Sequence, residues 1–266
     1  MNNLTQRILT GSVYVSVMLL ACTQPLYIGI LLLIVAIVGT FELKKIAEKQ
    51  NLNFDLYPTI TLGILTYASI LHPEISVFLF LAVFIYFISQ LYRPKKNTLQ
   101  LLGNTLISLV YIYLPLALII PIGLHSGNYE YKTLFGLLIL IWASDSWAYV
   151  SGRLLGKRKL FERLSPNKTW EGFWGSVFLT AATGYLLSIT GYGLNSLEWT
   201  ILGAITVFVA TAGDLFQSML KRSSNIKDSG NILPGHGGIL DRFDSILFCL
   251  PAYYIYFYHI SPLLNS

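Results

Sequence analysis

Charged residues are scarce in this chain. Asp, Glu, Lys and Arg make up 12% of the 266 residues, whereas a soluble domain carries about a quarter. The hydrophobic residues, 54% of the total, come in runs without a regularly repeating polar face. Together these absences exclude an ordinary soluble fold and predict an integral membrane protein.

Cysteine is almost absent as well. Cys22 and Cys249 both fall inside apolar runs, so we interpret them as small packing residues and expect neither a disulfide framework nor a cysteine metal site. Nucleic acid is not an expected partner, although the net charge is +5. The basic residues gather at the ends of apolar runs, which is the pattern that membrane topology produces.

Nine apolar segments approach the length of about 20 residues that a helix needs to cross a bilayer. The sequence therefore predicts an all-α polytopic membrane helix bundle with about nine transmembrane helices, in which the first, third and ninth are short. We expect one integral-membrane domain, 1–266, with N-terminal helices in 1–131 and catalytic helices and cytoplasmic loops in 132–266. The segments are 8–22, 25–41, 57–71, 74–92, 104–124, 132–151, 174–190, 199–219 and 245–260.

The basic residues also predict an orientation. If the N-terminus is cytoplasmic and nine helices cross the membrane, 17 of the 18 basic residues lie in cytoplasmic segments and only Lys132 lies outside. The positive-inside rule therefore favours a cytoplasmic N-terminus. The first segment is expected to remain as a helix, because a second apolar run follows it directly.

The sixth segment combines small residues with an acid. Ser144, Ala148, Gly152 and Gly156 recur at every fourth position, which predicts a seam that a neighbouring helix approaches closely. Asp145 lies one step from this seam. An acid within a span faces the bundle interior or a wet cavity, either as a structural hydrogen-bonding group or as part of a site.

The loop after the sixth segment carries a second set of candidates. Ser165 and Pro166 are expected to cap and begin a helix. Lys168 follows them, and it either obeys membrane topology or binds a phosphate.

Residues 221–245 lie between two apolar runs and hold seven of the charged residues, and Asp214 lies just before them. On a helix, Asp214, Ser218, Lys221 and Arg222 are expected to share one face, since they are four, seven and eight positions apart. Lysine and arginine suit phosphate oxygens, arginine through two parallel bonds that lysine cannot reproduce. Basic residues alone are also what a topology signal would supply.

Acids from a second helix join this group. Asp241 and Asp244 are three positions apart at the start of the ninth segment, so they face alike if the segment is helical. Carboxylates from two helices suit a hard cation such as Mg²⁺. The PGHGG stretch before them offers backbone amides to an anion, and His236 within it is either an acid–base group or a loop residue bonded to backbone. Such an apparatus suits phosphoryl or nucleotidyl transfer.

Two stretches resemble a known family. SMLKRSSNIKDSGNILPGHGGILDRFD, residues 218–244, resembles the signature of the phosphatidate cytidylyltransferases, the CDP-diacylglycerol synthases. DSWAYVSGRLLGKRKLFERLSPNKTWEG, which begins at Asp145, is similar to the second conserved segment of that family. The resemblance covers residues 142–245, with one departure at Ser146 and Trp147, where many members have Thr-Gly.

The resemblance implies a reaction in which the phosphate of phosphatidic acid attacks the α-phosphorus of CTP and yields CDP-diacylglycerol and pyrophosphate. It implies Mg²⁺ held by Asp214 and Asp241, with K⁺ as a candidate second cation. It also implies a homodimer in a bacterial inner membrane, with the active site facing the cytoplasm. The residues it assigns to catalysis are Asp214, Asp241, Lys221, Arg222, Ser218, Asp244 and His236; those it assigns to substrate binding are Asp145, Lys168, Lys227, Asp228 and Arg242.

Two other functions remain open. A polyprenol or phytol kinase would share the need for CTP and a metal. An ion-coupled transporter would use acids at the membrane midplane and paired broken helices, whereas the acids of this chain cluster at predicted cytoplasmic helix ends.

Overall fold

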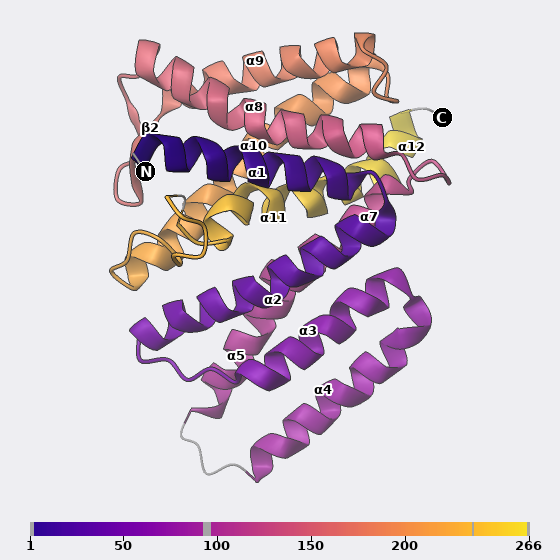
Figure 1. Ribbon diagram of the computed structural model, residues 1–266, viewed down its shortest axis with the longest axis vertical. Helices are drawn as coiled ribbons and strands as arrows, with labels where there is room; N and C mark the ends of the chain where they lie inside the picture. Colours follow the sequence, from indigo (N-terminus) through magenta and orange to yellow (C-terminus); the bar gives the residue numbers. More distant parts are fainter. Residues whose placement is uncertain (1–2, 93–96, 236, 265–266) are drawn as a thin grey trace.

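The computed structural model describes residues 3–92, 97–235 and 237–264, and the side chains of 8–92, 97–235 and 237–263 (Figure 1). Seven helical segments in the described chain are long and apolar enough to cross a membrane, and two further apolar helices are shorter. The prediction of an all-α polytopic membrane bundle is confirmed.

The helices follow the predicted order. The two shorter apolar helices are α1 (Asn3–Cys22), of which Ile8–Cys22 is the apolar part described, and α3 (Leu56–Leu71). The longer segments are α2 (Pro25–Lys49); η1 (Pro73–Ile75) with α4 (Ser76–Leu91); α5 (Thr98–Ser108) continuing through η2 (Leu109–Tyr113), α6 (Leu114–Ala117) and α7 (Ile119–Gly123); α8 (Tyr131–Leu155); α9 (Trp170–Ile189); α10 (Ser196–Ser223); and α11 (Leu240–Ile255) continuing through η3 (Tyr256–Ile260) and α12 (Ser261–Leu264).

The helix ends differ from the predicted segments where a helix extends past its apolar run. The ninth segment was expected to begin at residue 245, but α11 begins at Leu240, so its first turns contain the charged residues that hydropathy had excluded. In the same way α10 continues to Ser223 and includes Lys221 and Arg222. Basic residues in a last turn interact favourably with the negative end of the helix dipole.

The connection between α8 and α9 corrects one prediction. Ser165 and Pro166 do not start a helix: they begin strand β2 (Ser165–Thr169), which pairs antiparallel with β1 (Lys159–Phe161). Thr169 caps α9 instead, with its Oγ1 accepting the N–H of Gly172 at 3.1 Å. Proline is tolerated in a two-stranded ribbon with free edges, and threonine directly before the apolar run is also a favoured cap.

The seam predicted on α8 is confirmed, and its partner is α9. Ser176 Oγ donates a hydrogen bond to the carbonyl of Ser144 at 2.7 Å. A Cβ added to Gly172 would lie 2.9 Å from the carbonyl oxygen of Ala148 and 3.0 Å from the Cα of Gly152. The two backbones therefore pack so closely that no side chain fits between them at this point.

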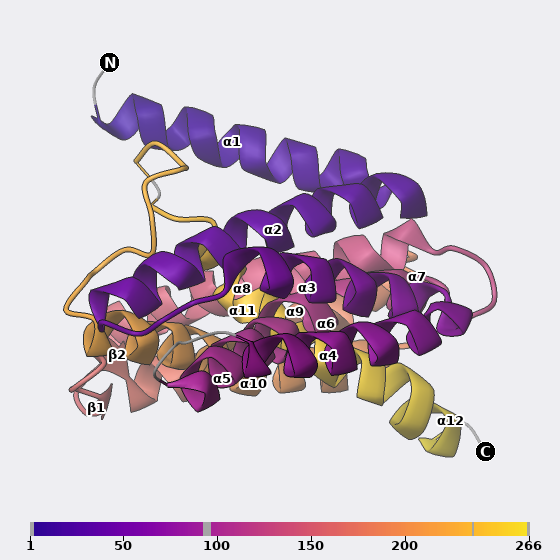
Figure 2. The same cartoon turned by 90° about the horizontal axis from the view of Figure 1, so that it is seen from below.

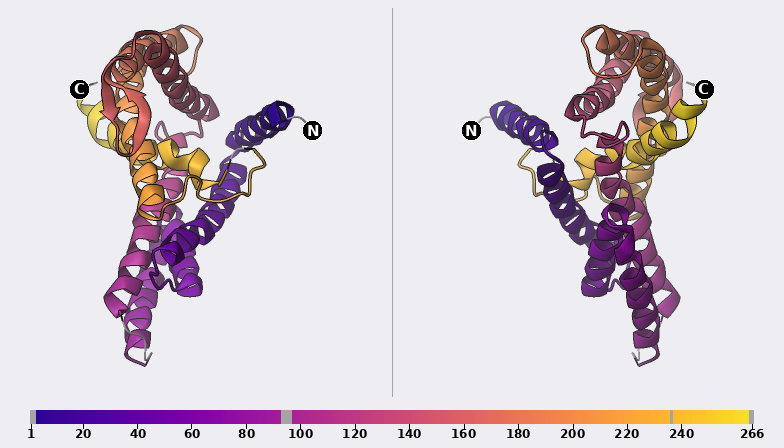
Figure 3. Two further views of the ribbon diagram at one scale, coloured as in Figure 1. Left: turned by 90° about the vertical axis from the view of Figure 1, so that its left-hand side faces the viewer. Right: turned by 90° about the vertical axis from the view of Figure 1, so that its right-hand side faces the viewer.

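The charged loops gather at one end of the bundle. Figure 2 shows the loop between α10 and α11 at the same end as β1 and β2, whereas the loop between α7 and α8 lies at the opposite end. Helices α8, α9, α10 and α11 pack against one another, and Figure 3 shows α1 and α2 leaning away from α9. The polar end of the bundle is thus formed by the helices whose sequences carry the signature residues.

Candidate functional site

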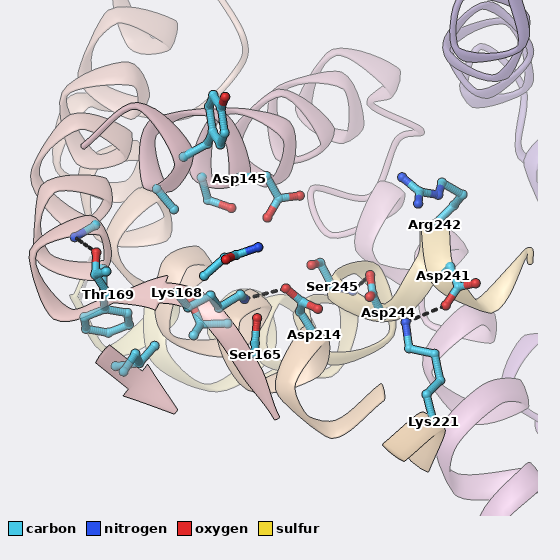
Figure 4. Close-up of a pocket in the computed structure, with 18 of the residues that line it drawn as sticks. Asp145, Ser165, Lys168, Thr169, Asp214, Lys221, Asp241, Arg242, Asp244 and Ser245 are labelled. Atoms are coloured by element: carbon cyan, nitrogen blue, oxygen red, sulfur yellow. Dashed lines mark hydrogen bonds and ion pairs between the residues drawn. The ribbon is translucent and has the colours of Figure 1, made fainter. Parts of the chain in front are cut away.

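A cavity of about 440 Å³ opens at this polar end (Figure 4). It is lined by α8, β2, the first turn of α9, α10, and the start of α11 with the loop before it. Eight of the predicted site residues line it: Asp145, Lys168, Asp214, Lys221, Asp228, Asp241, Arg242 and Asp244. Residues up to 99 positions apart in sequence are therefore brought to one space, which local spacing alone could not show.

An ion pair joins β2 to α10 across the cavity. Lys168 Nζ contacts Asp214 Oδ2, and Figure 4 shows the two side chains pointing toward one another. Their side chains are 26% and 33% exposed, so the pair remains open to solvent and to a ligand. Lys168 is therefore part of the cavity and is more than a topology signal.

A second pair, more deeply buried, joins α10 to α11. Lys221 Nζ donates to Asp241 Oδ1 at 2.7 Å, and the side chains are 11% and 4% exposed. The other oxygen of Asp241 accepts the N–H groups of Ser229 at 2.8 Å and Gly238 at 3.0 Å. Both oxygens of this carboxylate are thus used to hold the loop and the helix together.

Asp244 lies close to Asp214 because α10 and α11 touch beside them. A Cβ on Gly213 would collide with the backbone carbonyl of Asp244, so glycine is needed there for the two helices to approach. Figure 4 shows Asp244 beside Asp214 in the cavity, with Asp145 across from them on α8. Asp241 and Asp244 both line the cavity from the first turns of α11, as their spacing predicts.

Three predicted residues do not line the cavity. Ser218 is buried between helices, and Lys227 is exposed on the loop. Arg222 is exposed, and its Nη1 donates to the carbonyl of Ile226 at 3.0 Å. At about 100° per residue, Arg222 points about 80° away from Asp214 around the helix axis, whereas Lys221 points only about 20° away. The prediction that Arg222 shares a face with Asp214 was therefore too broad.

His236 lies outside the described residues, so its role stays a prediction. The roles of Ser218, Arg222 and Lys227 also stay predictions, although the position of Arg222 does not support phosphate binding.

The PGHGG stretch departs from expectation in a useful way. Its amides were expected to meet an external anion, but the protein's own carboxylates take the N–H groups that begin α11. Gly238 N donates to Asp241, and Ile239 N and Leu240 N donate to Glu42 at 2.8 and 3.0 Å. Gly237 has φ +87°, a backbone conformation that glycine adopts readily, and this turn aims the amides at the two carboxylates.

Several cavity residues were missed by sequence reasoning. Thr211 lies three positions before Asp214, and Ser245 lies four positions after Asp241, so helical periodicity would have found both. Ser165, Asn167 and Thr169 lie on β2 around Lys168; they were hidden because the segment was expected to be helical.

The oxygen donors of the cavity fit Mg²⁺ shared with a substrate. Within the described residues no group of three His, Cys, Asp or Glu side chains stands ready to hold a metal ion. Mg²⁺ is usually bound by one or two carboxylates together with substrate phosphates and water. Five aspartates line the cavity beside cationic side chains that suit phosphate, so this composition suits a cation that arrives with phosphate oxygens.

A smaller cavity of about 240 Å³ adjoins this site. It lies between α1, α8 and the signature loop, and its wall is mainly apolar, with Tyr14 and Val15 from α1, Trp142 from α8 and Leu233 from the loop. Arg242 lines both cavities. A cationic side chain thus stands where a charged space meets an apolar one.

The fold and the cavity define a bundle of apolar, membrane-length helices with a cavity lined by carboxylates and cations at one end. The chain matches the family model described as "Cytidylyltransferase family" over residues 5–260. It is 34% identical to the phosphatidate cytidylyltransferase of Bacillus subtilis over 267 residues, covering 96% of this chain and 97% of that protein.

Two further relatives agree with this match. The phosphatidate cytidylyltransferase of Haemophilus influenzae is 33% identical over 291 residues, covering 96% of this chain and 99% of that protein. The one of Pseudomonas aeruginosa is 43% identical over 122 residues, which is 45% of each chain. The chain therefore belongs to the cytidylyltransferase family.

Proposed function

We propose that this protein is a phosphatidate cytidylyltransferase, which converts CTP and phosphatidic acid to CDP-diacylglycerol and pyrophosphate. The observation that carries the proposal is the cavity, where five aspartates meet Lys168, Lys221 and Arg242 beside an apolar space. Cations bind the phosphates of both substrates, and an apolar wall accepts the lipid. Family membership and the names of the relatives support the same reaction.

In the proposed reaction an oxygen of the lipid phosphate attacks the α-phosphorus of CTP, and the bond to the oxygen that bridges the α- and β-phosphates breaks. The electron pair of that bond leaves with pyrophosphate. Lys168 and Lys221 bind phosphate oxygens and offset the charge of the triphosphate. Asp214 and Asp241, the partners of these lysines in the two ion pairs, are the residues that would hold Mg²⁺. Mg²⁺ would supply neutralisation of negative charge on the reacting phosphates.

Arg242 is the candidate ligand of the lipid phosphate. Its position between the two cavities allows the guanidinium to bind phosphate by paired hydrogen bonds while the acyl-glycerol part lies against Tyr14, Val15 and Trp142. CTP then occupies the charged cavity, nearer Lys168 and Lys221. This arrangement brings the attacking oxygen and the α-phosphorus together from opposite sides of Arg242.

The cavity is proposed to face the cytoplasm, where CTP is found. The charged loops share one end of the bundle (Figure 2), and the positive-inside rule places such loops on the cytoplasmic side. The bacterial relatives favour the inner membrane. A second cation such as K⁺ and a homodimer remain predictions from the family resemblance.

The test is turnover by purified protein in detergent micelles that contain phosphatidic acid, CTP and Mg²⁺. CDP-diacylglycerol and pyrophosphate should form in equal amounts, and replacing phosphatidic acid with diacylglycerol or a polyprenol should abolish the reaction. Asp214→Asn is the matched control, since it keeps the side-chain shape and removes the charge. A product formed from the polyprenol and absent with phosphatidic acid would favour a lipid kinase instead.

A further inference from the structure

Glu42 is a buried carboxylate that the proposed reaction does not use. It lies on α2, is 0% exposed and does not line the charged cavity. Three donors from the signature loop and the start of α11 converge on it: Ser229 Oγ at 2.7 Å, Ile239 N at 2.8 Å and Leu240 N at 3.0 Å. A carboxylate only accepts hydrogen bonds, so it suits a place where three donors meet.

The loop is shaped around this carboxylate. A Cβ added to Gly230 would lie 2.5 Å from Glu42 Oε1, and one added to Gly238 would lie 2.5 Å from Oε2. Both distances are too short for carbon against oxygen, so the two glycines leave the room that Glu42 occupies. Two glycines of the signature thus have a partner nearly 200 positions earlier in the chain.

The same loop residues also hold Asp241. Ser229 donates its hydroxyl to Glu42 and its backbone N–H to Asp241 Oδ2 at 2.8 Å. Gly238, where an added Cβ would meet Glu42, donates its N–H to the same oxygen of Asp241 at 3.0 Å. A shift of Glu42 would move both donors and change the position at which Asp241 faces Lys221 and the cavity.

We propose that Glu42 is a positioning residue, whose buried carboxylate fixes residues 229–240 so that Asp241 is presented to the charged cavity. The proposal rests on the proposed function for its kinetic consequence only. Glu42 lines neither of the two cavities. It acts through Ser229, Gly238 and the first turn of α11. An exclusively structural residue would change the amount of folded protein and leave the folded molecules normal.

Glu42→Gln tests the proposal, because the amide keeps the volume while one of its ends becomes a donor facing a donor. Thr40→Val is the matched control. Thr40 is also 0% exposed on α2, but its hydroxyl lies 2.8 Å from Ala36 O and 3.1 Å from Tyr113 OH, and neither partner belongs to residues 229–240. Two quantities are compared between the variants, each measured per folded molecule: the rate of tryptic cleavage after the exposed Lys227, and kcat with each substrate saturating.

Glu42→Gln is expected to lower kcat and to speed cleavage after Lys227 by about tenfold each, the size expected from losing one hydrogen bond to a charged group. Ser229→Ala, which keeps the backbone donors, should shift both quantities in the same direction by about threefold, and Thr40→Val should leave both within about twofold.

Wild-type cleavage and kcat in folded Glu42→Gln protein would overturn the proposal, and so would a lower yield of otherwise normal molecules. If wild-type protein formed no CDP-diacylglycerol, the proposed function would fail, but the cleavage rates would still decide whether Glu42 positions the loop.

Discussion

Variants of the Lys221–Asp241 pair should separate its contribution to folding stability from its contribution to turnover. Lys221→Met keeps the length of the side chain but leaves the Asp241 carboxylate without its cation. Removing one partner of a buried ion pair costs about 3–5 kcal/mol. We take the lower end, about 3 kcal/mol, because the cavity admits water and Asp241 keeps two backbone donors at 2.8 and 3.0 Å.

The double variant Lys221→Met with Asp241→Asn should recover most of this stability. The carbonyl oxygen of asparagine can still accept the N–H groups of Ser229 and Gly238, and neither partner leaves a charge behind. Replacing both members of a buried pair by neutral groups is often close to neutral. Activity should nevertheless stay more than tenfold below wild type, because the double variant lacks a candidate metal ligand and a phosphate-binding cation.

Thermal unfolding in detergent and CDP-diacylglycerol formation are the two assays. For a chain of this size, about 3 kcal/mol corresponds to a fall in Tm of roughly 6–12 °C for Lys221→Met, with the double variant within about 4 °C of wild type. An unchanged Tm for Lys221→Met would refute the buried pair. A double variant with normal turnover would remove both residues from the reaction.

Three further outcomes are expected. Arg222→Lys should keep kcat within about threefold of wild type, because Arg222 bonds the Ile226 carbonyl outside the cavity; a loss above tenfold would restore the phosphate-binding prediction. Gly172→Ala should lower Tm by several degrees, since its Cβ would meet the Ala148 carbonyl at 2.9 Å, and an unchanged Tm would contradict the close seam. Asn231→Cys should react with a membrane-impermeant thiol reagent in opened cells and not in intact ones, because its loop is proposed to face the cytoplasm. The two native cysteines are buried and should add little labelling of their own. Labelling in intact cells would reverse the orientation.

Much of the fold could be predicted from the sequence, because the thickness of the bilayer sets the length of each spanning helix. Apolar length predicted the helices, and small residues at every fourth position predicted that a neighbouring helix would approach α8 closely, although not which helix it would be. The spacing of Asp241 and Asp244 predicted that both would face one site. These features depend on local periodicity, which a single sequence displays.

Features that depend on distant packing were not predictable in this way. Lys168 contacts Asp214 from the strand Ser165–Thr169. This segment is a strand because it pairs with β1, whereas Ser165 alone resembled a helix cap. Glu42 drew no prediction from the sequence, because its hydrogen-bond partners Ser229, Ile239 and Leu240 lie nearly 200 positions later in the chain. Arg222 was included because its spacing from Asp214 looked helical, although its direction on the helix excludes it from the cavity.

The phosphate group that reaches the lipid tests the central claim most directly. Purified protein is supplied with phosphatidic acid, Mg²⁺ and CTP labelled either at the α- or at the γ-phosphate, and the label in the lipid fraction is measured. Cytidylyl transfer predicts that the α-label enters the lipid and that the γ-label leaves as pyrophosphate. Label from the γ-phosphate in the lipid, with none from the α-phosphate, would show a kinase and contradict the account.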